Sequence, residues 1–392
     1  MDAFMMTTER DAMRILHLID DFSTTNTGVA ATVSQLAGWQ AVRVGWVGIW
    51  TSGKIDIPVP EGVQVLPSPV HSWAPRWRYP VKGLGNLLRM LREHEVSHLH
   101  VHGVWQAGFV LGMLAAFMKG LPVVLSVHGM WSPAALGHGG RAKQLKKLSY
   151  WKLFGRWLML SRAGLHAITP LEALHIRAFA GRSEAVVLPN AIDLSCSASN
   201  QVIAQKPPLK QVVYLGRLHP IKGPDLLIKA FSDSELSSGW ELVLAGPEEV
   251  PSYVRELKAQ AAASKKSSQI RFVGPCYGLE KKALLAGAWV VVVPSHSEVV
   301  GMVNLEAASL CTPTITTHAT GLAHWQFGGG LLTEPTPDGL RLALNTVIQW
   351  NTEERLDRGR RVRRMVEQDF SLESVGAAWL RFYSDLGSQA KP

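Results

Sequence analysis

The sequence predicts an α/β protein built from two doubly wound, mostly parallel sheets. Runs of Val and Ile alternate with helical patterns along the whole chain, which is typical of parallel sheets covered by helices. The length of 392 residues and an apolar content of 47% suit two separate cores. Asn, Ser, Gln and Pro gather at 189–208, where hydrophobicity falls. We therefore predict one domain over 1–190, a second over 191–370, and an amphipathic helix over 371–386 in the closing segment 371–392.

Short apolar runs rich in β-branched residues predict the strands. In the first half they cover 14–19, 42–47, 63–66, 98–102, 122–128, 164–168 and 185–188. In the second half they cover 211–215, 241–245, 270–273, 289–293 and 314–317. Helical spacing fills the intervals, for example over 82–94, 144–161 and 337–350.

Two acids follow the predicted strand at 289–293. Glu298 lies in the loop, and Glu306 lies within a helical pattern that begins near 304. Ligands of open α/β sheets bind at the carboxyl ends of the strands, and a helix N-terminus there offers N–H groups to a phosphate. Carboxylates on both sides accept hydrogen bonds from hydroxyls, so the pair favours a sugar nucleotide as ligand. For either glutamate alone, helix capping is the simpler explanation.

A second loop carries fixed positive charge. Arg217 and Lys222 lie between Gly216 and Gly223, directly after the predicted strand at 211–215 and before a helical pattern. A guanidinium and an ammonium in a strand-to-helix loop form an anion site. A single loop cation is more often a solvated surface charge, but the strand, the glycines and the spacing favour the anion site.

These two loops together resemble a known family. The pattern Gly216-Arg217-x4-Lys222-Gly223, followed by Glu298-x7-Glu306, resembles the C-terminal half of the retaining glycosyltransferases of family 4, also called glycosyl transferases group 1. The resemblance implies a GT-B fold, in which two Rossmann-like domains face a cleft and the last helix packs back on the first domain. Further segments resemble family motifs: the hinge-like Leu188-Pro189-Asn190-Ala191-Ile192-Asp193, the stretch 313–321, Gly28 before a helix, and His128-Gly129 after a strand.

The resemblance also implies roles for individual residues. Glu306 would accept hydrogen bonds from ribose hydroxyls, while Arg217 and Lys222 would neutralise the departing diphosphate. Glu298 would hold hydroxyls of the donor sugar. The catalytic set is thus Arg217, Lys222, Glu298 and His128, and the donor-binding set is Gly28, Gly216, Arg217, Lys222, Glu298, Val300, Gly301, Met302 and Glu306. Val300 stands where the family usually has Phe, and Ala191 replaces the hinge Gly.

The first half contains several histidines whose role stays open. His98, His100 and His102 share one face of a predicted strand, an arrangement compatible with a metal. No acid or cysteine nearby completes such a site, so we expect no metal and place His100 and His102 at the strand end, lining the cleft. The resemblance places His128 beside the transferred sugar, although a satisfied core histidine is the alternative. A turn glycine is likewise the alternative for Gly28.

Nearly all the formal charge of +9 lies in the first half, where residues 1–190 hold 19 Lys or Arg and 11 Asp or Glu. Between 139 and 165 there are seven cations, no acid and several large aromatics. Such a segment, 141–162, is typical of a helix on an anionic membrane surface. An ordinary helix with its aromatic side in the core is equally compatible. Nucleic-acid binding ranks lowest, since no recognition motif accompanies the charge.

The remaining features concern location and cofactors. Three cysteines, Cys196, Cys276 and Cys311, are too few and too far apart for a disulfide framework or a zinc site. The start of the sequence has no signal pattern, and no apolar run is long enough to span a membrane. We expect a cytoplasmic protein, peripheral on the inner face of the membrane if 141–162 binds lipid, with no cofactor and no metal requirement.

These expectations combine into one function and two alternatives. The favoured function is retaining transfer of a sugar from a nucleoside-diphosphate-sugar to a glycan or polyprenyl-linked acceptor, in surface polysaccharide or lipopolysaccharide biosynthesis. The alternatives are a sugar-nucleotide-binding scaffold without activity and a sugar-nucleotide epimerase of related fold. The intact set of four charged residues argues against the scaffold.

Overall fold

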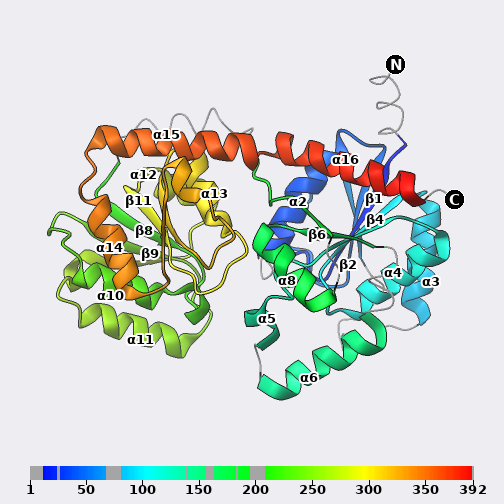
Figure 1. Cartoon of the computed structure of the whole chain (residues 1–392), viewed down its shortest axis with the longest axis horizontal. Coiled ribbons are helices and arrows are strands. Elements are labelled where there is room, and N and C mark those ends of the chain that lie inside the picture. Colours follow the sequence, from blue (N-terminus) through cyan, green and yellow to red (C-terminus); the bar gives the residue numbers. More distant parts are fainter. Residues whose placement is uncertain are drawn as a thin grey trace. The chain divides into compact units, whose positions relative to one another are not determined.

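The computed structural model describes residues 12–23, 27–67, 81–137, 140–155, 163–181, 184–194 and 208–390. The chain divides into two compact units (Figure 1). Unit 1 comprises Met1–Ala191 with Leu372–Pro392, and unit 2 comprises Ile192–Ser371. Each unit is an α/β domain with its own parallel sheet, as the sequence predicts.

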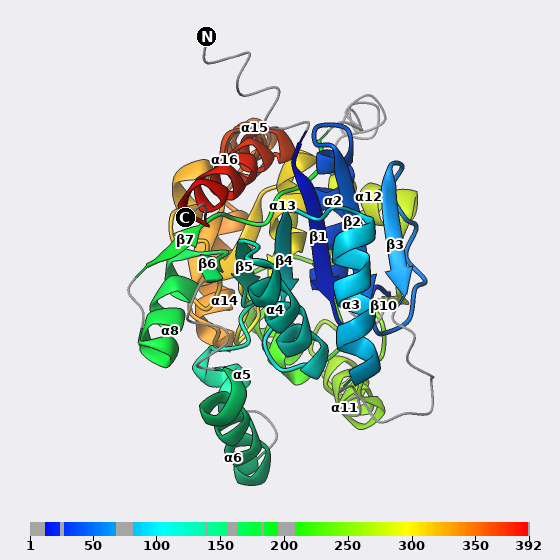
Figure 2. The same cartoon turned by 90° about the vertical axis from the view of Figure 1, so that its right-hand side faces the viewer.

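Unit 1 is built on a seven-stranded sheet of order β3-β2-β1-β4-β5-β6-β7, whose pairings are all parallel (Figure 2). The order reverses between β1 and β4, so a topological switch point lies there. The strands are β1 (Arg14–Ile19), β2 (Trp46–Thr51), β3 (Val63–Pro67), β4 (His98–His102), β5 (Val123–Ser126), β6 (Ala163–Ala167) and β7 (Ala185–Val187).

Helices cover both faces of this sheet. One face packs on α3, α4 and α8, and the other on α2 and the C-terminal helix α16. Because alternate strand residues point to opposite faces, Leu16 and Leu18 join the first core, while Ile15 and Ile19 join the second. The helices of unit 1 are α2 (Thr27–Ala41), α3 (Val81–Glu93), α4 (Ala107–Lys119), α5 (Pro133–Gly137), α6 (Gly140–Tyr150), the π-helical turn η2 (Trp151–Gly155), α8 (Pro170–Ala180) and α16 (Leu372–Ala390).

The core beneath α2 and α16 contains a polar strip. His17 on β1 pairs in register with His100 on β4, and both side chains are fully buried. Tyr383 of α16 packs over the strip and is also fully buried. Gly164 on β6 lets α16 come close, because a Cβ there would press on Leu386.

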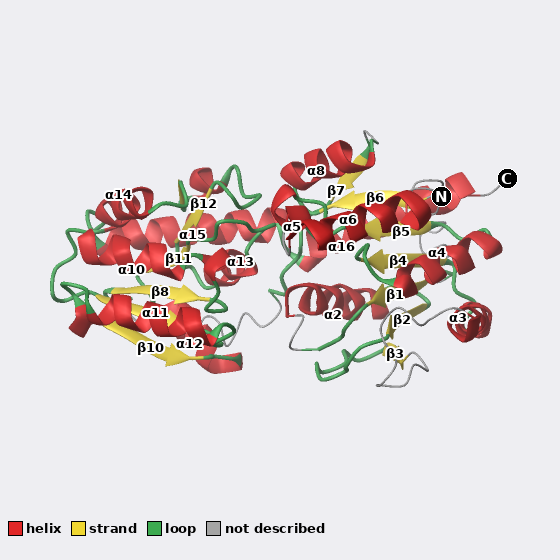
Figure 3. Cartoon of the chain, turned by 90° about the horizontal axis from the view of Figure 1, so that it is seen from below, coloured by secondary structure: helices red, strands yellow, loops and turns green. Residues whose placement is uncertain are grey.

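Unit 2 contains a six-stranded sheet of order β10-β9-β8-β11-β12-β13, again with parallel pairings (Figure 3). Its strands are β8 (Gln211–Leu215), β9 (Glu241–Ala245), β10 (Ile270–Gly274), β11 (Val290–Val293), β12 (Thr314–Thr317) and β13 (Leu331–Thr333). The chain adds strands on one side of β8 and then on the other, so the switch point lies between β8 and β11.

Two apolar layers enclose this sheet. Val212 and Tyr214 face α10, α11 and α14, whereas Val213 faces α12 and α13. Arg355 of α15 is buried, and its guanidinium donates to the carbonyl oxygens of Ala288 and Trp289, which precede β11. The helices are η3 (Pro220–Lys222), α10 (Pro224–Asp233), α11 (Pro251–Ala262), η4 (Ser267–Gln269), α12 (Gly278–Gly287), α13 (Met302–Ser309), η5 (Trp325–Gly328), α14 (Pro337–Val347) and α15 (Thr352–Asp369).

Some sequence-based boundaries are wrong. The second strand starts at Trp46 rather than at 42, because the N–H groups of Arg43 and Val44 both bond to the carbonyl of Gln40 and close the end of α2. The helix predicted over 144–161 ends as α6 at Tyr150 and continues as the π-helical turn, and 156–161 lie outside the described residues. Strand β13 is missed, because its three residues are too short for a period to be recognised.

None of the helices in the described part of the chain is both long enough and apolar enough to span a membrane.

Candidate functional site

The acid pair and the cation loop meet at the switch point of unit 2. Gly216 to Gly223 follow the carboxyl end of β8, and Glu298 follows that of β11, the neighbouring strand. The two loops are joined by a hydrogen bond of 2.9 Å from the backbone N–H of His296 to the carbonyl of Ile221. Sequence segments about 75 residues apart therefore form one surface because their strands are adjacent in the sheet.

Glycines allow these loops to approach. Gly223 has φ +66°, and a Cβ at this position would collide with the carbonyl oxygen of Pro294. Gly246, after β9, has φ +147°, and a Cβ there would collide with the carbonyl oxygen of Gly216. The loops after β8, β9 and β11 are thus packed backbone against backbone, which holds the charged side chains on a rigid base.

Lys222 and Glu298 form the central ion pair. The Lys222 ammonium lies 2.7 and 2.6 Å from the two carboxylate oxygens of Glu298. The side chains are 19% and 18% exposed, so the pair is accessible at the surface but screened less than a fully exposed one. Without an anion nearby, each charge neutralises the other. A phosphate and sugar hydroxyls would offer both groups new partners.

Glu306 lies on α13 with one oxygen paired and one unpaired. Its Oε1 accepts a 2.7 Å hydrogen bond from the ammonium of Lys281 on α12. Its Oε2 is buried and has no hydrogen-bond partner among the described residues. A buried carboxylate oxygen without a donor is costly, so this atom is suited to a ligand hydroxyl.

Arg217, which we expect to bind the donor diphosphate, forms an ion pair with a carboxylate in the structure. Its Nη1 contacts both carboxylate oxygens of Glu249, at 2.8 and 2.7 Å, and the two side chains are 45% and 41% exposed. No hydrogen bond or ion pair in the described part of the chain joins Arg217 to Lys222 or Glu306. The backbone of Arg217 is held more firmly, since its carbonyl accepts a 2.7 Å bond from the hydroxyl of buried Tyr214.

Helix α13 starts between the two acids. Gly301 is its N-cap residue with φ +68°, and no side chain caps the helix there. A Cβ on Gly301 would lie 2.9 Å from the amide nitrogen of Asn304. The Asn304 side chain is buried and bonds to the carbonyl of Val300 and to the hydroxyls of Thr314 and Thr316, so it fixes the turn. The first N–H groups of α13, including that of Met302, therefore start from a rigid and uncapped end.

His128 lies in a strained turn that follows β5 of unit 1. It has φ +51° and Gly129 has φ +74°. The buried carboxylate of Glu172 holds this turn, because its two oxygens accept bonds from the N–H groups of Gly129 and Ile168. Burial raises the pKa of Glu172 above its ordinary value. The Nε2 of His128 lies 3.0 Å from the Nδ1 of His102.

A small cavity adjoins His128. It has a volume of about 20 Å³, enough for roughly one water molecule. Its lining includes Thr32, His102, Ser126, His128, His166 and Asn190. His102 lines this cavity, whereas His100 is fully buried in the core and is not among the lining residues.

Gly28 starts the exposed first turn of α2. A Cβ at this position would meet nothing within 4 Å, so nearby atoms do not demand a glycine. The residues directly before it, 24–26, lie outside the described part of the chain.

Several residues of these sites were missed from the sequence. Glu249, Lys281 and Glu172 each pair with a predicted site or its turn, yet they lie on separate elements with no motif around them. Asn304 could have been found from the sequence, because an amide side chain on the buried face of the first turn of a helix needs hydrogen-bond partners.

Comparison with known proteins agrees with the geometry. Residues 198–364 match the family model described as glycosyl transferases group 1, and residues 26–195 match the model described as glycosyltransferase family 4. A D-inositol 3-phosphate glycosyltransferase of Salinispora tropica is 30% identical over 262 residues, covering 60% of this chain and 52% of the relative. The chain thus matches about half the length of that relative.

Solved structures show the same fold at lower identity. Anabaena HepE, solved in complex with UDP and glucose, has a TM-score of 0.72 at 19% identity and covers 95% of this chain and 100% of that one. WaaG, a glycosyltransferase involved in lipopolysaccharide biosynthesis, has a TM-score of 0.71 at 17% identity and covers 94% and 99%. With two family models that together span most of residues 26–364, this chain belongs to the group 1 and family 4 glycosyltransferases of GT-B fold.

Proposed function

We propose that this glycosyltransferase moves a hexose, with retention of anomeric configuration, from a nucleoside-diphosphate-sugar to a hydroxyl of a glycan or polyprenyl-linked acceptor. A role in surface polysaccharide or lipopolysaccharide biosynthesis fits this chemistry. The single observation that carries the proposal is the unpartnered, buried Oε2 of Glu306, on the helix that starts beside the Lys222–Glu298 pair. UDP bound to the structurally similar HepE supports a nucleotide donor.

The donor would replace the internal ion pairs. A ribose hydroxyl would donate to Oε2 of Glu306, whose other oxygen is held by Lys281. The diphosphate would draw Lys222 from Glu298 and Arg217 from Glu249, and α13 would add its uncapped N–H groups. Glu298, once released, would accept hydrogen bonds from the donor sugar.

Charge placement explains how these residues would accelerate transfer. As the glycosidic bond to the diphosphate breaks, negative charge grows on the leaving oxygens, and two preorganised cations stabilise it. This arrangement needs no metal or cofactor, and we propose that the enzyme uses none. The acceptor would bind unit 1 near His128.

Donor use is tested with a panel of nucleoside-diphosphate-sugars and a labelled lipid or glycan fraction. We expect release of nucleoside diphosphate coupled to labelling of the acceptor, at a rate that EDTA leaves unchanged. Lys222→Ala should lower kcat/KM by about a hundredfold, since a charge-assisted contact to the leaving group is lost. Lys229→Ala, which breaks an exposed i,i+4 pair on α10, is the matched control.

The same assay separates the alternative functions. Tight donor binding with no turnover would support a scaffold, and an altered sugar nucleotide without acceptor labelling would support an epimerase. Wild-type turnover in Lys222→Ala would contradict the role given to this side chain.

We also propose that α6 and η2 contact an anionic membrane surface at the cytoplasmic face. Leu145, Leu148 and Leu153 are exposed, and Lys146 and Lys152 beside them are exposed as well. Trp151 instead faces the core, where it packs edge-on against Trp131, so the segment is anchored to unit 1 on its inner side. The side chains of 141–143, 154 and 155 and all of 156–162 lie outside the described residues.

Co-sedimentation with liposomes tests this contact. We expect binding to vesicles that contain an anionic phospholipid and loss of binding in Lys146→Glu/Lys152→Glu, with Lys258→Glu/Lys265→Glu, at two exposed lysines of unit 2, as a charge-matched control. Equal binding to neutral and anionic vesicles, or none to either, would remove the membrane hypothesis without touching the transfer reaction.

A further inference from the structure

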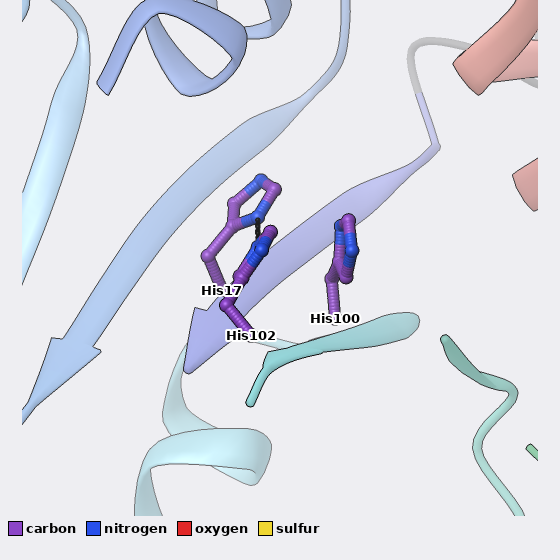
Figure 4. A group of neighbouring side chains, drawn as sticks. All are labelled: His17, His100 and His102. Carbon is purple, nitrogen blue, oxygen red and sulfur yellow. Dashed lines mark hydrogen bonds between the residues drawn. The ribbon is translucent and has the colours of Figure 1, made fainter. Parts of the chain in front are cut away.

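A continuous chain of hydrogen bonds crosses the core of unit 1 beneath α16. It connects side chains from four strands and two helices and ends at His128 beside the cavity. Figure 4 shows its centre, where His17 of β1 and His102 of β4 point toward each other and His100 lies next to them. We call this chain of hydrogen bonds the histidine relay. Its members, in order, are His166, Ser126, His100, Tyr383, Gln40, His17, His102 and His128.

At the His166 end of the relay, a backbone carbonyl fixes which ring nitrogen carries the hydrogen. The Nε2 of His166 lies 2.8 Å from the carbonyl oxygen of Leu188. A carbonyl only accepts, so Nε2 carries the hydrogen, and Nδ1 of the neutral ring accepts from the Ser126 hydroxyl at 2.7 Å. The hydroxyl hydrogen is then used, and Oγ of Ser126 accepts from Nε2 of His100 at 2.7 Å.

The same direction continues through Tyr383 and Gln40. Nδ1 of His100 is left as an acceptor and receives the Tyr383 hydroxyl at 2.7 Å. The Tyr383 oxygen accepts a longer bond of 3.5 Å from the Gln40 amide N–H, which turns Oε1 of Gln40 toward His17. Nε2 of His17 donates to that oxygen at 2.8 Å.

The last two bonds determine the state of His128. Nδ1 of His17 must accept from Nε2 of His102, at 2.9 Å, and Nδ1 of His102 must accept from Nε2 of His128, at 3.0 Å. His128 therefore carries its hydrogen on Nε2. No described residue forms a hydrogen bond with Nδ1 of His128, so this nitrogen keeps a free lone pair.

This order of hydrogen bonds requires neutral histidine rings, and burial keeps the rings neutral. Burial lowers the pKa of His17 to about 4, and that of His166 to about 4. Burial, followed by repulsion from the neighbouring histidines, holds the pKa of His100 and His102 well below the ordinary value. Burial also lowers the pKa of His128 to about 3.

We propose that this relay fixes His128 as the Nε2–H tautomer, so that Nδ1 accepts a hydrogen bond from a hydroxyl of the sugar substrate at the cavity. His102, His17, Gln40 and Tyr383 are then positioning residues, which set the acceptor without touching substrate. The part concerning the sugar hydroxyl rests on the proposed function, whereas the tautomer rests on the relay alone.

The relay also accounts for a group of nitrogens that resembles a metal site. One ring nitrogen each of His17, His100 and His102 lies within 4.8 Å of the others. Every ring nitrogen of these three side chains already has a hydrogen-bond partner, and no carboxylate belongs to the group. A dication would have to break these bonds and remain uncompensated in a buried site.

Nuclear magnetic resonance reads the tautomer directly. The full chain, labelled with ¹⁵N-histidine, gives a long-range ¹H–¹⁵N correlation spectrum in which Nδ1–H and Nε2–H rings have different patterns. At pH 7.5 we expect the Nε2–H pattern for His128, identified by its loss in His128→Asn. An Nδ1–H pattern or a mixture in the wild type would overturn the relay, as would loss of the Nε2–H signals when Zn²⁺ is added.

Substitution in the middle of the relay should release the far end. Gln40→Met removes the acceptor for His17, so both directions become possible, and His128 should become a mixture of tautomers with kcat/KM for transfer lowered about tenfold. His98→Gln is the matched control: His98 is also buried on β4 and bonds to the carbonyl of Tyr383, but it lies off the relay. It should leave the His128 pattern unchanged.

A second variant guards against misfolding. Tyr383→Phe removes one hydroxyl, keeps the ring packing, and frees Gln40 to turn, so it should also mix the His128 tautomers. An unchanged Nε2–H pattern in folded Gln40→Met or Tyr383→Phe would refute the positioning role. The spectra decide the tautomer whether or not transfer is detected, so failure of the relay and failure of the proposed function give different results.

Discussion

The two carboxylate oxygens of Glu306 have different surroundings: one is bonded to a lysine, and the other has no hydrogen-bond partner among the described residues. Lys281 bonds to one oxygen, so the carboxylate is oriented before a donor nucleotide binds. The other oxygen is buried and unpartnered among the described residues, and its desolvation is offset only when a hydroxyl arrives.

Glu306→Ala should therefore weaken donor binding while the fold is kept. We expect Kd for the nucleoside diphosphate to rise about tenfold or more, because a hydrogen bond to a charged group contributes roughly 1.5–3 kcal/mol. Isothermal titration calorimetry measures this change. Glu241→Ala, which removes an ion-paired glutamate at the amino end of β9, should leave Kd unchanged, and an equal effect of both variants would contradict the assignment.

Lys281 should act on the same contact from the other side. Lys281→Met removes the ammonium that orients Glu306 and should also raise Kd for the nucleotide, by a smaller factor of about three to ten. The double variant Lys281→Met/Glu306→Ala should bind no more weakly than Glu306→Ala alone, since the two residues act through one carboxylate. Additive losses in calorimetry would show that Lys281 contacts the ligand independently.

At the scale of elements, the site depends on two loops that touch through backbone atoms. Gly223→Ala should destabilise unit 2 by about 1–3 kcal/mol, because Ala disfavours φ +66° and its Cβ collides with Pro294. Urea unfolding measures the loss, and nucleotide affinity should fall with it as Lys222 moves. At Gly239 a Cβ meets nothing within 4 Å, so Gly239→Ala should have little effect on either quantity.

The strands also show where sequence patterns were sufficient to predict the bounds of an element. β1, β4, β8, β9 and β12 start and end at the residues predicted from the sequence. The start of β2 was misplaced, since Val42 and Val44 look strand-like but belong to the turn that closes α2. Local composition does not reveal a hydrogen bond to Gln40.

At the scale of the whole molecule, the buried histidines couple stability to pH. They are neutral in the folded protein, with pKa values of about 3 for His128 and about 4 for His17 and His166, against 6.5 for an ordinary histidine. Between these values the unfolded chain binds more protons than the folded one. Stability is therefore full above about pH 6.5 and falls as pH decreases toward 4.

Thermal unfolding between pH 7.5 and 5 should reveal this loss. Each buried histidine contributes up to about 1.4 kcal/mol per pH unit, so several together should lower Tm steeply over the acidic part of the range. His17→Gln should flatten the dependence, whereas His324→Gln, at an exposed histidine of unit 2, should leave it unchanged. A Tm independent of pH from 7 to 5 would contradict neutral burial.

The sequence by itself determined the two parallel-sheet domains and the loops that carry Arg217, Lys222, Glu298 and Glu306, because strand runs and charged loop residues are local features. Only the tertiary structure decided the partners of those charges: Glu249 for Arg217, Glu298 for Lys222 and Lys281 for Glu306. It also decided that histidines from separate strands join Tyr383 of the last helix in one relay. The physical reason is that a hydrogen bond needs two atoms about 3 Å apart, and for groups distant in sequence only the packing of sheet and helices sets that distance.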